Sequence, residues 1–149
     1  GTYGFKAGPV SGEMMAEVLG RLGTEGAWVV HGHGGLDEVS LSGPTRVAEL
    51  RGGIVRCFDV EPSDFGVERA NTAALLGGDA AHNASIARAI LDGERSPRRD
   101  AVVVNAAAAL CAAGVAASPR VAAEKAAAVI DSGAARAKLA AWLAFAGAP

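Results

Sequence analysis

Two adjacent carboxylates, Asp37 and Glu38, are the residues of this 149-residue chain whose types and spacing most clearly suit chemistry. They end the segment His31–Glu38, whose sequence HGHGGLDE is polar, rich in glycine and free of Lys and Arg. Mg²⁺ is typically held by one or two carboxylates, while substrate phosphates and water complete its shell. Because Asp and Glu are mostly exposed in any protein, a solvated loop is the competing interpretation and stays open. The pair predicts a magnesium site for a phosphate-bearing substrate.

The other polar groups near this pair and farther along the chain have simpler interpretations. His31 and His33 would share a face of a strand, but a transition metal needs a third protein ligand that the sequence does not identify. We therefore expect structural or hydrogen-bonding histidines. Gly77-Gly78-Asp79 precedes a predicted helix and could present N–H groups to an anion. An N-capping Asp79 would accept those bonds itself, so no anion site is expected there.

Several function classes are excluded by what the sequence lacks. No serine lies in Gly-x-Ser-x-Gly, and neither a Walker loop nor a Gly-x-Gly-x-x-Gly helix start occurs. Cys57 and Cys111 have no disulfide or zinc spacing, which favours a reducing, cytoplasmic compartment. The net charge of −2 predicts neither a nucleic-acid partner nor attachment to a membrane surface. The uncharged segment Ala101–Pro119 is mostly alanine, so we expect no membrane span.

The elements that must position the acidic pair are strands and turns. Ala27–Val30 is a short apolar run with glycines around it, which predicts a strand buried on both faces of a parallel sheet. The pair would then follow the carboxyl end of that strand, where open α/β sheets bind ligands. Val39–Leu41 predicts another short strand. Arg46–Leu50 and Ile54–Val60 flank Gly52-Gly53 and predict an antiparallel hairpin.

Helices are expected before these strands and throughout the second half. Ser11 is a candidate N-cap for the first helix, and Ser118-Pro119 begins a later one that stops at Gly133. Three further helices are expected at Asp79–Leu91, from Asn105 onward with Asn105 as N-cap, and around Leu139–Phe145. Two further strands are expected at Gly1–Phe5 and Ala101–Val104. The predicted fold class is α/β, with a mixed sheet, a β-hairpin and C-terminal helices, in one domain or domain fragment over residues 1–149.

The run Val29–Thr45 resembles the VHG-x-x-GLDE-hydrophobic-S-x-TGPT signature of the anthranilate phosphoribosyltransferases. The similarity extends from about Met15 to the C-terminus. It includes the segments Pro62–Gly66, Gly77–Gly93, Asp100–Ala107 and Asp131–Ala135. The resemblance implies part of the large α/β domain of that family, within the nucleoside phosphorylase and phosphoribosyltransferase fold group.

The resemblance also implies an activity. Members of the family transfer phosphoribose from phosphoribosyl pyrophosphate to anthranilate in tryptophan biosynthesis, with Mg²⁺ as cofactor and with both compounds as partners. The family's acidic pair matches Asp37 and Glu38, which would help to hold magnesium on the pyrophosphate rather than act as nucleophile or base. A homodimer is implied for full-length members, and no catalytic residue is implied for this chain.

Some parts of the family's pattern do not occur in this sequence. The GTGGD phosphoribosyl-pyrophosphate loop, the KHGN segment and most of the N-terminal helical domain are missing, and His33 stands where an acidic residue is common. We therefore expect a C-terminal fragment that is inactive alone. Two alternatives stay open: a pyrimidine nucleoside phosphorylase relative, which the GLDE-to-TGPT run disfavours, and a non-catalytic binding module of the same fold.

Overall fold

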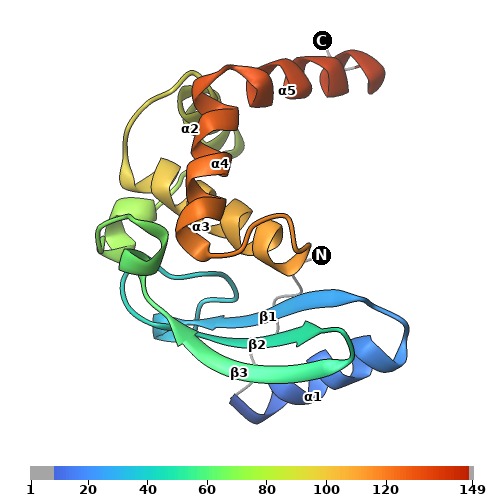
Figure 1. Ribbon diagram of the computed structural model, residues 1–149. Coiled ribbons are helices and arrows are strands. Elements are labelled where there is room, and N and C mark those ends of the chain that lie inside the picture. The colour runs from blue at the N-terminus through green and yellow to red at the C-terminus, as the bar shows by residue number, and fades with distance from the viewer. Residues whose placement is uncertain (1–8, 148–149) are drawn as a thin grey trace.

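A computed structural model describes residues 9–147 (Figure 1). The helices are α1 (Pro9–Arg21), α2 (Ala80–Leu91), α3 (Pro97–Ala112), α4 (Pro119–Asp131) and α5 (Ala134–Phe145), and the strands are β1 (Gly26–Gly32), β2 (Thr45–Arg51) and β3 (Ile54–Val60). Three short 3₁₀ turns are η1 (His33–Gly35), η2 (Pro62–Phe65) and η3 (Thr72–Leu75). The α/β class, the hairpin and the C-terminal helices are confirmed, whereas the strand expected at Gly1–Phe5 lies outside the described residues.

The strands form a sheet in the order β1-β2-β3, and both pairings are antiparallel. The parallel pairing expected for Ala27–Val30, and with it the expected mixed sheet, is therefore wrong for the residues that the structure describes. The apolar run has a different cause, because helices cover both faces of the sheet: α1 lies on one side and α3 on the other (Figure 1). Trp28 and Val30 point into the main core, while Ala27 and Val29 pack in the small cluster beneath α1.

The hairpin between β2 and β3 forms where the sequence predicts it. Arg51 pairs with Ile54, and the two intervening glycines, Gly52 and Gly53, have φ values of 56° and 79°. Positive φ at both central residues is what a two-residue turn between twisted strands requires. The hairpin brings β3 and the residues that follow it back beside the loop that leaves β1.

Helix α3 replaces the strand expected at Ala101–Val104. Ser96 caps the helix, since its Oγ accepts a hydrogen bond from Arg99 N at 3.4 Å, and Pro97 occupies the first turn. Its buried positions recur at helical spacing: Val103, Val104, Ala107, Ala108 and Cys111. Asn105 is consequently a mid-helix residue, so the expectation that it caps a helix is wrong. Ser11 likewise lies inside α1, which begins at Pro9, and is not its N-cap.

The main core extends from the sheet to α3 and α4, and these two helices pack against each other through small side chains. Ala107 and Ala108 on α3 are buried, as are Ala122, Ala123 and Ala126 on α4. An ion pair between a buried arginine and a partly exposed aspartate closes one end of this interface. Arg99 Nη2 donates to Asp131 Oδ1 at 2.8 Å, and the Arg99 side chain is only 4% exposed. Arg95 Nη2 donates to the other oxygen of Asp131 at 3.0 Å. One carboxylate therefore connects two arginines of the segment that begins α3.

The two cysteines have different surroundings. Cys57 is exposed on β3 and Cys111 is buried on α3, and both are free. Burial is the main cause that raises the pKa of the Cys111 thiol, while Arg51 lowers that pKa and Glu49 raises it. Cys111 therefore stays protonated and acts as a small apolar core residue. None of the helices within residues 9–147 combines the length and apolar character that crossing a bilayer requires.

Candidate functional site

The acidic pair lies in a tight loop at the end of β1. The strand ends at Gly32, and the turn η1 follows with Gly34 and Gly35 at φ values of 77° and 82°. Leu36 then returns to the strand end, where its carbonyl accepts a hydrogen bond from Gly32 N at 2.8 Å. Asp37 and Glu38 come next, and both are exposed. The loop thus displays two neighbouring carboxylates directly after a backbone bridge.

Gly32 lets the chain after the acidic pair pass very close to the strand end. A Cβ atom on Gly32 would overlap the Glu38 carbonyl oxygen, and it would lie 3.2 Å from the Cβ atoms of both Leu36 and Ser40. The backbone of Gly32 is extended, so the requirement for glycine is steric and does not come from a positive φ. The position of Glu38 therefore requires a residue without a side chain at position 32, which is Gly32.

Asn105 on α3 holds the residue that follows the pair. Its Oδ1 accepts a hydrogen bond from Val39 N at 2.9 Å, and its Nδ2 donates to Val39 O at 3.2 Å. Nδ2 also donates to Ala101 O, one turn earlier in the helix, at 2.9 Å. Sequence reasoning missed this role because it placed Asn105 at a helix end; the mid-helix position of an asparagine could have pointed to it.

The segment Val39–Leu41 is not the strand that the sequence predicts. It is a buried irregular segment, and its backbone polar groups form separate hydrogen bonds with different partners instead of pairing with a neighbouring strand. Ser40 N donates to Thr45 Oγ1 at 2.9 Å, and Leu41 O accepts from Ala70 N at 2.9 Å. Ser40 is 1% exposed and Thr45 is fully buried, so these bonds are shielded from water. The chain after the acidic pair is fixed in the protein interior.

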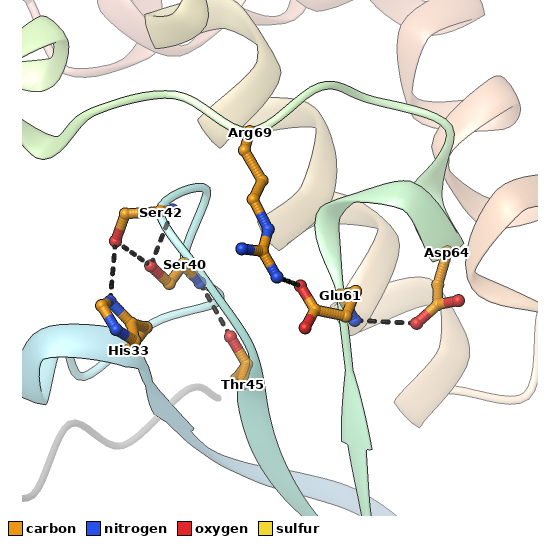
Figure 2. Close-up of polar contacts among 7 residues, drawn as sticks. All are labelled: His33, Ser40, Ser42, Thr45, Glu61, Asp64 and Arg69. Atoms are coloured by element: carbon orange, nitrogen blue, oxygen red, sulfur yellow. Dashed lines mark hydrogen bonds and ion pairs between the residues drawn. The ribbon is translucent and has the colours of Figure 1, made fainter.

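His33 takes the hydrogen-bonding role expected of it. Figure 2 shows its ring beside Ser42, with His33 Nδ1 at 3.3 Å from Ser42 Oγ. Ser42 Oγ lies 2.9 Å from Ser40 Oγ, which also accepts from Ser42 N at 3.1 Å. His31 lies half-buried on β1, opposite Arg46. Within residues 9–147, no group of three His, Cys, Asp or Glu side chains could hold a metal ion by itself.

A cleft of about 450 Å³ opens beside this loop. One wall contains His33, Gly34 and Ser42, and the other is the segment Arg69–Thr72. Arg69 Nη2 donates to Glu61 Oε2 at 2.8 Å, so the guanidinium is held over the start of η2 (Figure 2). Sequence reasoning gave Arg69 no role, because an isolated arginine in a turn-rich segment has no distinctive pattern.

The chemistry of Asp37 and Glu38 fits a divalent cation. Neither carboxylate forms an ion pair with another residue of the described range 9–147, so no cationic side chain there competes with a metal ion for them. Two hard oxygen donors without a third protein ligand suit Mg²⁺ in particular, because that ion usually keeps waters and binds substrate phosphates. The donor set therefore fits the predicted ion, provided that a substrate completes the coordination.

Comparison with known proteins gives the family. Residues 9–136 match the family model described as "Glycosyl transferase family, a/b domain". The chain belongs to this glycosyl transferase family. The matched range includes the whole sheet, the acidic loop and the helices α1 to α4, so the site described above lies inside the family's α/β domain.

The relatives of this glycosyl transferase chain are anthranilate phosphoribosyltransferases. The protein of Rhodospirillum rubrum is 55% identical over 137 residues, which are 92% of this chain and 40% of that protein. The crystal structure from Thermus thermophilus matches with a TM-score of 0.79 and 40% identity, over 88% of this chain and 38% of that one. A Saccharomyces cerevisiae enzyme in complex with PRPP and Mg matches with a TM-score of 0.64 and 30% identity, over 71% and 31% of the two chains. This chain thus spans about 40% of the length of the curated relatives it matches.

Proposed function

We propose that this chain is the metal-binding part of an anthranilate phosphoribosyltransferase, with Asp37 and Glu38 holding Mg²⁺ against the pyrophosphate of phosphoribosyl pyrophosphate. The observation that carries the proposal is the pair itself. Two exposed carboxylates without an ion-pair partner in the described range follow a strand end, and the backbone is bonded both before and after them. The relative solved with PRPP and Mg supports the choice of ion and substrate.

The chemistry explains why two acids are wanted at this place. In phosphoribosyl transfer, negative charge grows on the pyrophosphate as the bond to the ribose breaks. Bound Mg²⁺ would supply positive charge at that leaving group. Asp37 and Glu38 would orient the ion and would exchange no proton with the substrate. Arg69 and the His33–Ser42 pair would line the cleft beside the loop.

The domain assignment is part of the same proposal. Residues 1–149 would form one α/β unit, and the full-length protein would form a homodimer. The GTGGD and KHGN segments of the family's pattern do not occur in these 149 residues. The purified 149-residue chain is accordingly expected to consume no anthranilate when phosphoribosyl pyrophosphate and Mg²⁺ are supplied. Loss of anthranilate fluorescence is the measurement, with the Rhodospirillum rubrum enzyme as positive control.

A chimera tests whether the inactive chain is a part of an anthranilate phosphoribosyltransferase or belongs to a protein with another activity. In it, this chain replaces the matching 40% of the Rhodospirillum rubrum enzyme. We expect the chimera to consume anthranilate in a manner that depends on phosphoribosyl pyrophosphate. Turnover by the isolated chain would contradict the fragment assignment, and a folded but inactive chimera would contradict the assigned activity.

Replacing both acids tests the metal site in that chimera. Asp37→Ala with Glu38→Ala is expected to raise the Mg²⁺ concentration for half-maximal activity about tenfold or more, because the ion loses its two charged protein ligands. The fold should persist, since both side chains are exposed and neither is in the core. The matched control is Glu68→Ala with Glu94→Ala, which removes two exposed carboxylates that, like Asp37 and Glu38, form no ion pair within the described range. An unchanged magnesium dependence of the double variant would refute the site.

A further inference from the structure

Asn105 is an unusual residue for the place it occupies. It lies in the middle of α3, a 16-residue helix, where asparagine is a weak helix former because its amide competes for backbone hydrogen bonds. All three of its side-chain bonds in the structure go to backbone atoms, and two of them go to Val39, 66 positions earlier in the chain. Asn105 therefore stabilises the conformation of the loop that contains Val39.

The bonds to Val39 replace those that a neighbouring strand would make. Val39 is 3% exposed, so its N–H and C=O groups are shielded from water and need partners inside the protein. One amide side chain supplies both, an acceptor for the N–H and a donor for the C=O. The bond from Nδ2 to Ala101 O fixes which way the amide points, since a flipped amide would place its oxygen against two carbonyls.

We call the two hydrogen bonds between Asn105 and the Val39 backbone the Asn105 clamp, and the clamp lies directly beside the acidic pair in the sequence. Val39 directly follows Glu38, and Leu36 directly precedes Asp37. The backbone is therefore held on one side by the Gly32–Leu36 bridge and on the other by Asn105. Only the two acidic residues lie between these anchors. No other side chain in the described range donates or accepts a hydrogen bond at the Val39 backbone.

We propose that Asn105 is a positioning residue for the cation site, which it controls by holding the Val39 backbone and so fixing where Asp37 and Glu38 lie on the loop. The inference rests on the proposed magnesium role of that pair. Asn105 itself does not touch the ion or the substrate. It acts from α3, an element that contributes no ligand, and links the position of the acidic loop to the packing of the helical core.

The test measures Mn²⁺ binding to the 149-residue chain in the presence of inorganic pyrophosphate, with electron paramagnetic resonance as the readout. Asn105→Ala is expected to weaken binding about tenfold, as loss of a group that orients metal ligands does elsewhere. The matched control is Asn83→Ala on α2. Asn83 clamps Gly78 in the same way, accepting from Gly78 N at 2.9 Å and donating to Gly78 O at 3.0 Å, but on a different loop. We expect its Mn²⁺ affinity to equal that of the unmodified chain.

A second measurement, amide hydrogen exchange at Val39, tests the hydrogen bonds from Asn105 without any metal ion. The Val39 amide should exchange its hydrogen about five- to tenfold faster in Asn105→Ala, because its acceptor is gone. Asn105→Leu has nearly the same shape as asparagine but carries neither an acceptor nor a donor, so it is expected to show the same faster exchange. Exchange at Ala48 in the sheet reports whether the fold persists, and the Leu variant provides the exchange test if the Ala variant does not fold.

The outcomes separate the two proposals. Tight Mn²⁺ binding by Asn105→Ala, together with lost binding in the Asp37→Ala, Glu38→Ala chain, overturns the positioning role and leaves the metal site standing. Equal binding by the Asp37→Ala, Glu38→Ala chain and the unmodified chain overturns both. Unchanged Val39 exchange in Asn105→Ala or in Asn105→Leu, with Ala48 still protected, also overturns the clamp. Weakened binding and faster Val39 exchange in Asn105→Ala, with Asn83→Ala unaffected, supports it.

Discussion

Gly32→Ala is expected to destabilise the protein by about 1–3 kcal/mol, in the range measured for overpacked interiors, and to abolish Mn²⁺ binding at the acidic pair. The new methyl group would overlap the Glu38 carbonyl oxygen, which belongs to the backbone and has no rotamer with which to move aside. The chain from Leu36 to Ser40 must then shift, and both carboxylates move with it. Urea denaturation measures the stability, and electron paramagnetic resonance measures the binding.

Gly12→Ala is the matched control for this substitution. A Cβ atom on Gly12 would lie 3.8 Å from Val29 Cγ1 and 3.9 Å from Ala48 Cβ, which are ordinary contacts, within helix α1. Alanine in place of glycine inside a helix stabilises by about 0.5–1 kcal/mol. The same chemical change should thus have opposite signs at the two positions. A Gly32→Ala protein with unchanged stability and Mn²⁺ affinity would show that the loop does not depend on this close approach.

Asp131→Ala is expected to have the largest effect on stability among the ion pairs, a loss of about 3 kcal/mol. It leaves the Arg99 guanidinium buried without its carboxylate, and the Nε atom of that group already has no hydrogen-bond partner in the structure. The value lies at the lower end for buried pairs because the Asp131 side chain is 38% exposed, so water reaches the site. Thermal unfolding and urea denaturation measure the loss.

Asp92→Ala provides the comparison. Asp92 caps the C-terminus of α2, as Asp131 ends α4, so both substitutions remove a negative charge from a helix end. The partner of Asp92 is Arg136 at 3.1 Å, with side chains that are 57% and 67% exposed. An exposed pair contributes about 0–1 kcal/mol. If the Asp131 and Asp92 variants lose equal stability, burial of Arg99 does not set the strength of its ion pair.

The elements with local start and stop residues could be predicted from the sequence. Ser118-Pro119 and Gly133 bracket α4 as expected, and Asp79 caps α2 by accepting from His82 N at 2.8 Å. Gly52-Gly53 likewise identified the hairpin. In each case a cap or a turn depends on a few neighbouring residues, so the pattern needs no knowledge of the tertiary structure.

The errors arose where burial decided the outcome. The apolar run Ala101–Val104 is too short to distinguish a strand from one face of a helix. The dipeptide Ser96-Pro97 distinguishes the two, since the same dipeptide at Ser118-Pro119 begins α4. The parallel partner expected for Ala27–Val30 failed for a similar reason, because two-sided burial arises from helices on either face as well as from parallel pairing.

The candidate site also contains residues that could be predicted from the sequence and residues that could not. Asp37 and Glu38 stand out in the sequence by type and by resemblance, and their metal role stays a prediction. The residues that hold them do not stand out. Gly32 is one of 20 glycines, and Asn105 is 66 positions from the backbone it clamps. Contacts over such separations follow from the fold and have no local pattern.

The bonds on either side of the acidic pair affect the entropy of ion binding. Ordering the backbone of a residue costs about 1–2 kcal/mol, so a long free loop would weaken any cation that had to order it. Here the bridge at Leu36 and the clamp at Val39 restrict the loop when the protein folds, and only two residues remain to be ordered by a ligand. The folded core thus bears the conformational cost in advance, and a small ion with two protein ligands needs correspondingly less binding energy.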